Sequence, residues 1–189
     1  MRVVSGQNKG LVLKSVPGKT TRPTSDKVKE AVFNMVGPYF KGGMMLDLYA
    51  GSGAMGIEAI SRGMEKAVFV DRERKAVETV YTNIKAAGLE ARAEVFRTEA
   101  HRALKALKKK SSQFRFIFLD PPYAKQKLNE ELAFIDENEL LQEDGFIVAE
   151  HSSKIFLEST FLNFSKQREE TYGDTVITIF QSNRKEGSE

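Results

Sequence analysis

Residues 44–53 read Met44-Met45-Leu46-Asp47-Leu48-Tyr49-Ala50-Gly51-Ser52-Gly53, and this stretch decides the fold. Its first half is a short apolar run of the kind found in a buried strand. Glycines follow at positions 51, 53 and 56, and a helix-compatible stretch continues to residue 62. A buried strand that leads through a glycine-rich turn into a helix predicts an α/β domain with a ligand at the turn.

The alternation of strand and helix continues along most of the chain. Because strands alternate with helices, we expect a doubly wound, mainly parallel sheet that is covered on both faces, with ligands outside the carboxyl ends of its strands. A helix is expected from Ser25 or Thr24 to Gly37-Pro38, which stops it. Further helices are predicted over 74–87, 100–109 and 128–137, and strands over 67–71, 91–96, 114–119 and 145–150, with two antiparallel strands over 161–164 and 175–180.

Two acidic residues near the glycine turn indicate which cofactor it binds, since the glycine pattern alone fits nicotinamide cofactors equally well. Asp47 stands four residues before Gly51, where its carboxylate would repel a pyrophosphate but attract an ammonium group. Asp71 stands 20 residues after Gly51, at the end of the next strand, where a carboxylate binds both ribose hydroxyls. S-adenosylmethionine, which has a ribose and an amino acid but no phosphate, fits both positions.

The expected cofactor-binding set is wider than these two carboxylates. Glu99 follows the third strand, where its side chain would reach the adenine amino group. Asp71 and Glu99 also have an ordinary structural interpretation, because each stands where an acidic residue would stabilise the start of a helix. The predicted cofactor-binding residues are Asp47, Tyr49, Ala50, Gly51, Ser52, Gly53, Asp71, Arg72, Glu99 and Ala100.

The tetrapeptide Asp120-Pro121-Pro122-Tyr123 comes directly after the apolar strand expected over 114–119. The exocyclic amine of a base is a poor nucleophile because its lone pair is delocalised into the ring, so its methylation needs acceptors that hold the amino hydrogens. Asp120 would supply a carboxylate oxygen and Pro121 a carbonyl on a stiff turn, while Tyr123 would stack on the base. These four residues, Pro122 included, are the predicted catalytic set, and they indicate methyl transfer to a nitrogen.

Composition and charge narrow the remaining classes. The 189 residues suggest one domain, the absence of cysteine excludes disulfides and thiolate metal sites, and two histidines give no reason to expect a metal. No apolar run reaches the roughly 18 residues of a membrane span and no signal peptide is evident, so a cytoplasmic protein without a membrane partner is expected. Residues 1–41 carry a net charge of +6 in a chain of net charge +3, a pattern typical of proteins that meet a polyanion, although a solvated lysine-rich surface gives it too.

Three segments together resemble the RsmD family of S-adenosylmethionine-dependent methyltransferases. They are Arg22-Pro23-Thr24-Ser25-Asp26-Lys27-Val28-Lys29-Glu30-Ala31-Val32-Phe33-Asn34, the turn over 47–53 and the tetrapeptide over 120–123. The resemblance implies a seven-stranded Rossmann-like methyltransferase sheet with the last strand antiparallel. It also implies methyl transfer to the N2 amine of a guanine in 16S ribosomal RNA, with S-adenosylhomocysteine as the second product. The family often has Asp where Glu99 stands and Phe where Tyr49 stands, and neither departure changes the class.

The resemblance completes the expected domain organisation and partners. We expect a basic β-hairpin or arm over 1–21 that helps to hold RNA, a methyltransferase domain over 22–183 and a tail over 184–189. The expected acceptor is 16S rRNA within a small-subunit assembly particle, bound by a monomer. The expected RNA-binding residues are Lys9, Arg22, Lys27 and Lys125.

Two other functions stay open at the level of the sequence. The first is amino methylation of DNA adenine N6 or of a protein glutamine, since related enzymes use similar Pro-Pro-Tyr turns. The missing large target-recognition domain argues against the DNA substrate, and the Arg22-Pro23-Thr24 segment argues against the protein substrate. The second is a non-catalytic RNA-binding assembly factor, against which the intact carboxylates Asp47, Asp71 and Asp120 argue.

Overall fold

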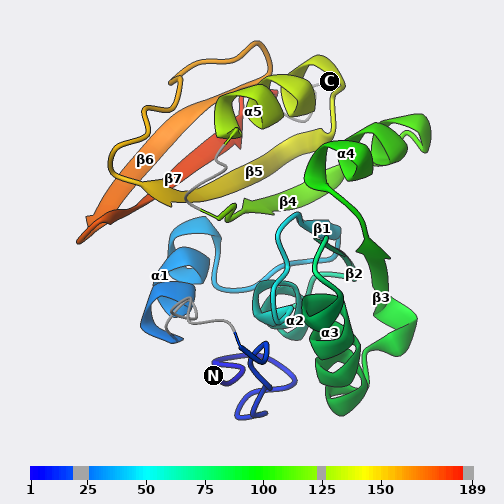
Figure 1. The fold of residues 1–189 in the computed structure, drawn as a ribbon. Helices are drawn as coiled ribbons and strands as arrows, with labels where there is room; N and C mark the ends of the chain where they lie inside the picture. Colours follow the sequence, from blue (N-terminus) through cyan, green and yellow to red (C-terminus); the bar gives the residue numbers. More distant parts are fainter. Residues whose placement is uncertain (19–25, 123–126, 185–189) are drawn as a thin grey trace. The chain divides into compact units, whose positions relative to one another are not determined.

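Strands and helices alternate along the chain, as Figure 1 shows for a computed structural model that describes residues 1–18, 26–122 and 127–184. The chain forms two compact units, Met1–Ala100 and His101–Glu189. No helix within the described ranges is both long and apolar enough to cross a membrane. The predicted domain limits at residues 21 and 183 stay predictions.

The first unit contains three parallel strands, with β2 between β1 and β3. These strands are β1 (Met44–Asp47), β2 (Lys66–Asp71) and β3 (Ala93–Arg97). Asp47 pairs with Phe69, and Asp71 pairs with Arg97, so the strands all end at the same edge. Acidic residues therefore end both β1 and β2 at that edge, as the sequence predicted.

Helices connect these strands and pack against them. The helices of this unit are α1 (Asp26–Val36), α2 (Ala54–Ser61) and α3 (Arg74–Ala87), and a 3₁₀ turn, η1 (Glu90–Arg92), precedes β3. Every residue of α2 is buried, which explains its nearly uniform apolar composition. The helix α3 ends at Gly88, whose φ of 66° lies in the left-handed region that favours glycine at a helix end.

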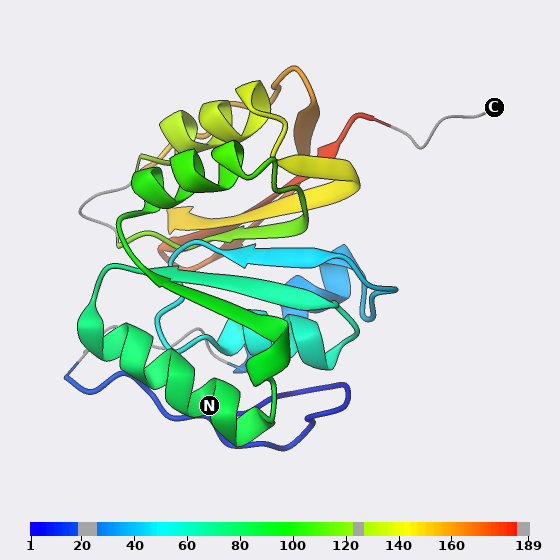
Figure 2. The same ribbon diagram turned by 90° about the vertical axis from the view of Figure 1, so that its right-hand side faces the viewer.

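The second unit contains four strands in the order β4, β5, β7, β6. The parallel pair is β4 (Phe114–Leu119) with β5 (Leu141–Ser152), and β7 (Thr175–Ser182) runs antiparallel to both β5 and β6 (Phe164–Tyr172). Helices α4 (Ala100–Lys109) and α5 (Leu128–Glu137) lie on the same side of β4 and β5 (Figure 2). The predicted antiparallel end of the sheet is confirmed.

One predicted strand was wrong. A strand was expected over 161–164 because Phe161 and Phe164 are apolar, but β6 begins only at Phe164 and continues to Tyr172. The two phenylalanines instead pack on Phe180 of β7, with ring centroids 5.9 and 5.8 Å from its own. The polar residues that follow form a strand because β6 pairs only with β7 among the described strands, which leaves much of it exposed to water.

The first residues of the chain form a hairpin that packs on the first unit. Arg2 and Val12 form an antiparallel bridge, and the Val3 N–H donates to the Leu11 carbonyl over 2.9 Å. Val3 and Leu13 are buried, so the hairpin contributes to the core. Its turn carries Lys9, which is exposed.

A buried cluster of charges fastens this hairpin to α1 and α2. The carboxylate of Glu58 accepts hydrogen bonds from the Val4 and Ser5 N–H groups, over 2.8 and 3.0 Å. It also pairs with Arg62 at 2.7 Å and with Lys29 at 3.3 Å. The side chains of Lys29, Glu58 and Arg62 are no more than 3% exposed. Water therefore does not solvate these charges, and each depends on its partners in the protein.

Glu58→Ala should lower the free energy of unfolding by about 3–5 kcal/mol, because it removes the buried carboxylate that pairs with Arg62 and Lys29. Lys29 keeps its pair with Asp26, at 3.6 Å. Urea denaturation followed by circular dichroism measures this change. Glu78→Ala is the matched control, since Glu78 pairs with Arg74 at the surface and an exposed helical pair contributes below about 0.5 kcal/mol. Equal effects of the two substitutions would contradict the stabilising role of the buried cluster.

Candidate functional site

The glycine turn between β1 and α2 is closed by short backbone hydrogen bonds. The Gly53 N–H donates to the Ala50 carbonyl over 2.7 Å, and the Ala50 N–H donates to Val70 over 2.9 Å. Gly51 and Gly53 have φ values of 54° and 79°, in the region that glycine adopts most easily. A Cβ on Gly51 would meet no atom within 4 Å, so the outer side of the turn has room for a ligand.

Gly56 has a different role from the other glycines of this motif. A Cβ at position 56 would lie 2.2 Å from the ring of Phe69 on β2. The absence of a side chain therefore allows α2 to approach the strand closely. This approach brings the N–H of Gly56 within 3.4 Å of Asp47 Oδ2.

Asp71 joins the end of β2 to the glycine turn. Its Oδ2 accepts the Gly51 N–H over 2.9 Å, and its Oδ1 accepts the Glu73 N–H over 2.9 Å. The second bond goes to the residue that precedes α3, which begins at Arg74, so Asp71 orders both the turn and the segment that leads into α3. Each carboxylate oxygen keeps a further lone pair, and a pair of ribose hydroxyls is the donor set that fits them.

Asp47 is buried beneath the turn with one oxygen unused. Its Oδ2 accepts the Gly56 N–H, whereas its Oδ1 is buried and has no hydrogen-bond partner among the described residues. The pKa of Asp47 is raised to about 7, chiefly because burial disfavours the charged form. The Gly56 hydrogen bond lowers this pKa, and the charge of Asp71 adds to the rise. A buried carboxylate oxygen without a donor is costly, and an ammonium group would supply what it lacks. The residues of this turn therefore fit S-adenosylmethionine.

The ends of β2 and β3 bring further predicted residues together. The Thr98 N–H donates to the Asp71 carbonyl over 3.1 Å, and Glu99 forms an ion pair with Arg72 at 3.7 Å. Arg72 also pairs with Glu73 at 3.1 Å. The Arg72 and Glu99 side chains are largely exposed, and α4 begins at Ala100.

Asn83 on α3 was not predicted as a site residue, although it contacts the turn. Its side-chain amide donates to the Ser52 carbonyl over 2.9 Å and to the Lys14 carbonyl over 3.0 Å. Its Oδ1 accepts the Lys14 N–H over 2.8 Å. Asn83 thereby links the segment after the N-terminal hairpin to the glycine turn, a tertiary contact for which the sequence carries no local signal.

The Asp-Pro-Pro motif lies in the second unit, directly after β4. Asp120 is half-buried, Pro121 is buried and Pro122 is exposed. Among the predicted RNA-binding residues, Lys9 and Lys27 are exposed. Tyr123, Arg22 and Lys125 lie outside the described residues.

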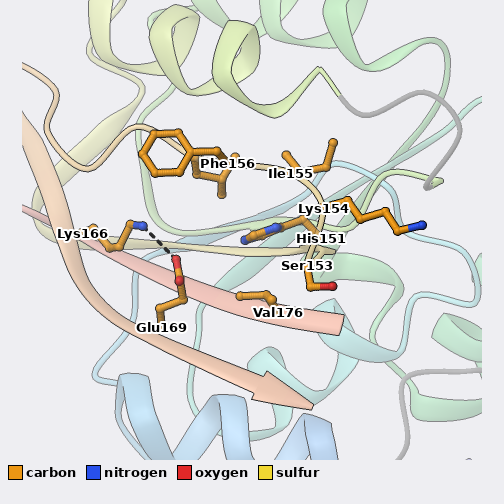
Figure 3. Close-up of a pocket in the computed structure, with 9 residues that line it drawn as sticks. His151, Ser153, Lys154, Ile155, Phe156, Lys166, Glu169 and Val176 are labelled. Atoms are coloured by element: carbon orange, nitrogen blue, oxygen red, sulfur yellow. Dashed lines mark hydrogen bonds and ion pairs between the residues drawn. The ribbon is translucent and has the colours of Figure 1, made fainter. Parts of the chain in front are cut away.

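A shallow hollow of about 210 Å³ lies elsewhere in the second unit, beside β5 and β6 (Figure 3). None of the predicted site residues lines it. His151 at its base is buried, which lowers its pKa, and Nδ1 lies 3.0 Å from the Ser152 carbonyl. Since a carbonyl only accepts, Nδ1 donates to Ser152, and Nε2 lies 2.9 Å from the Thr178 hydroxyl, which itself donates to Glu169 over 3.2 Å. Its hydrogen bonds and burial give His151 a structural role in this unit.

Comparison with known proteins decides the family. The family model described as "Conserved hypothetical protein 95" matches residues 1–181. YlbH of Bacillus subtilis (strain 168), whose name assigns it provisionally to the rRNA methyltransferases, is 55% identical over 181 residues, which are 96% of this chain and 98% of YlbH. The chain belongs to this family, the RsmD family of methyltransferases.

More distant members of the RsmD family support the same assignment. The ribosomal RNA small subunit methyltransferase D of Escherichia coli (strain K12) is 28% identical and is matched over 96% of this chain and 89% of its own. The solved structure of Escherichia coli yhhF is 29% identical and superimposes with a TM-score of 0.81, covering 96% of this chain and 97% of that chain. The Rossmann-like methyltransferase fold with seven strands is therefore confirmed, and the chain is an enzyme of the methyltransferase class.

Asp47→Asn should remove a pH-dependent loss of stability. The folded-state pKa of Asp47 is raised to about 7, so its contribution to stability is complete below the unfolded pKa near 4 and is lost as the pH rises to 7. At about 1.4 kcal/mol per pKa unit, the loss is about 4 kcal/mol. Denaturant unfolding without cofactor should therefore show that the free energy of unfolding of the variant rises relative to that of the wild-type protein between pH 4 and pH 8. A difference that does not change with pH would contradict the raised pKa.

Proposed function

We propose that this enzyme transfers a methyl group from S-adenosylmethionine to the N2 amine of a guanine in 16S ribosomal RNA. The observation that carries the proposal is the pair of carboxylates at the glycine turn. One is buried with an oxygen that has no partner in the described part of the chain, and the other stands at the next strand end. An RsmD relative named for ribosomal RNA of the small subunit supports the substrate class. An assembly particle as acceptor, a monomeric enzyme and a cytoplasmic location belong to the same proposal.

The cofactor-binding roles follow from the donors and acceptors of the turn. Asp47 Oδ1 would accept from the ammonium group of the cofactor, and the Asp71 carboxylate would accept from the ribose hydroxyls. Glu99 would accept from the adenine amino group, with Arg72 holding its carboxylate. Bound S-adenosylmethionine supplies an electrophilic methyl group on a sulfonium.

The Asp-Pro-Pro motif would hold the acceptor amine. Asp120 and the Pro121 carbonyl would each accept one amino hydrogen, which directs the nitrogen lone pair out of the plane of the base. Transfer forms a nitrogen–carbon bond, breaks a carbon–sulfur bond and releases one proton from the amine, and Asp120 is the proposed acceptor for that proton. A guanine in an RNA helix has its N2 amine in the base pair, so the base would be unpaired or flipped.

Tritiated methyl transfer to small-subunit particles from cells that lack this gene tests the function. The expected product after nucleoside digestion is labelled N2-methylguanosine. If no nucleoside of the particle is labelled, the same assay is repeated with DNA and with protein as the acceptor. Label in N6-methyldeoxyadenosine of the DNA, or in the protein, would then replace the proposed acceptor with one of the two other amine classes. Cofactor binding without label in any acceptor would favour a non-catalytic assembly factor.

Asp120→Asn should reduce kcat by about 10²–10³-fold, the usual loss when one stabilising hydrogen-bond partner of the reacting group is removed. The affinity for S-adenosylmethionine, measured by calorimetry, should change by less than about threefold because Asp120 is not among the proposed cofactor ligands. Asp144→Asn is the control, since Asp144 is an exposed aspartate of the same unit. Retained turnover in the Asp120 variant would refute its role.

A further inference from the structure

The carboxyl end of β5 carries an acidic residue, Glu150, next to the Asp-Pro-Pro motif. The parallel register of β4 and β5 pairs Leu119 with Ala149. One residue beyond this pair, the chains continue as Asp120 and Glu150, so the register places the two carboxylates on neighbouring strands at the same edge. Both belong to the second unit.

The carboxylate of Glu150 is partly buried, and its hydrogen-bonding capacity is not fully used. Its Oε2 is buried and has no hydrogen-bond partner among the described residues. On its other side, Glu150 pairs with Ile177 of β7, which is fully buried. Desolvation raises the pKa of this carboxyl. A buried acceptor without a donor reduces the stability of the free protein. Such a group is expected at a site where a bound ligand supplies the missing donor.

We propose that Glu150 reads the Watson–Crick edge of the target base and selects guanine. This inference rests on the proposed function and names the residue that gives it base specificity. Guanine presents the N1–H donor beside its N2 amine, so Glu150 would accept from N1–H while Asp120 holds the amine. The two carboxylates on adjacent strands would thereby match two adjacent donors of one base.

Adenine would be rejected by the same carboxylate. Its N1 carries a lone pair beside the N6 amine, so an ionised Glu150 would face another acceptor and neither group would have a hydrogen. A site built to bond a polar group discriminates strongly against an analogue that leaves its buried atoms unpaired. Glu150 would therefore decide between two bases that both offer an exocyclic amine.

Steady-state kinetics of Glu150→Gln test this role on the small-subunit particles that accept label from the wild-type enzyme. We expect kcat/KM for the particle to fall by about 10–100-fold, as for the loss of a charge-assisted hydrogen bond. The affinity for S-adenosylmethionine and the Tm should not fall. Glu150→Asp keeps the charge and should recover part of the activity. Glu143→Gln, an exposed substitution on the same strand, should match the wild type.

The outcomes separate this inference from the function on which it rests. If the wild-type enzyme yields no N2-methylguanosine, the proposed function fails before any variant is compared. If it does, a Glu150→Gln enzyme with unchanged kcat/KM overturns the base-reading role alone. A purely structural carboxylate predicts a raised Tm with unchanged kinetics, because glutamine removes the cost of a buried charge. A parallel loss of cofactor affinity would likewise overturn the proposal.

Discussion

The hydrogen bond from the Gly51 N–H to the Asp71 carboxylate is the interaction on which the conformation of the glycine turn depends. It joins the turn after β1 to the end of β2 over 2.9 Å. The turn reaches Asp71 because Gly51 adopts a positive φ, and the same turn starts α2 above Asp47. One local conformation thus exposes a backbone surface to a ligand, orients one carboxylate and buries the other.

Both units place an incompletely satisfied carboxylate at the carboxyl end of a strand. Asp47 ends β1 with Oδ1 unpartnered, and Glu150 stands near the end of β5 with Oε2 unpartnered, among the described residues. Burial raises the pKa of each. Glu58 shows that the chain can satisfy a buried carboxylate fully, with four donors around it. At both positions, we propose that a bound ligand supplies the missing hydrogen-bond donor.

Most helices and strands could be predicted from the sequence, because in these segments the local residue pattern favours the same structure as the surrounding packed chain. The limits of α3 and β4 were predicted to the residue, since Gly88 ends the helix and the strand is a continuous apolar run. The strand β6 was missed because an exposed strand at the end of a sheet needs no apolar alternation, so its residues have the composition of a loop. The start of β5 at Leu141 was missed for a similar reason, since polar residues precede Gly145.

The site residues divide in the same way. Asp47 and Asp71 were predictable because motif spacing fixes them relative to the glycines, and the structure places both beside the turn. Asn83 and Glu58 act through partners distant in sequence, and the position of Glu150 beside Asp120 follows from the register of β4 and β5, so only the packed structure shows these relations. Glu58 did leave a signal, because it is a single charge in an otherwise apolar helix. Such a residue indicates a buried ion pair, although the sequence does not name its partner.

Net charge in the sequence is also an imperfect guide to the charge available to a polyanion. Lys29 counts toward the +6 of residues 1–41, yet its side chain is 1% exposed and its charge is paired with Glu58. A polyanion is attracted by charges that are exposed at the protein surface, such as those of Lys9 and Lys27. The N-terminal region therefore divides its lysines between two tasks. A buried lysine fastens the hairpin to α1 and α2, and under the proposed function the exposed lysines would attract an RNA backbone. Because different side chains would carry these tasks, we expect substitution of an exposed lysine to weaken the proposed RNA binding without loosening the hairpin.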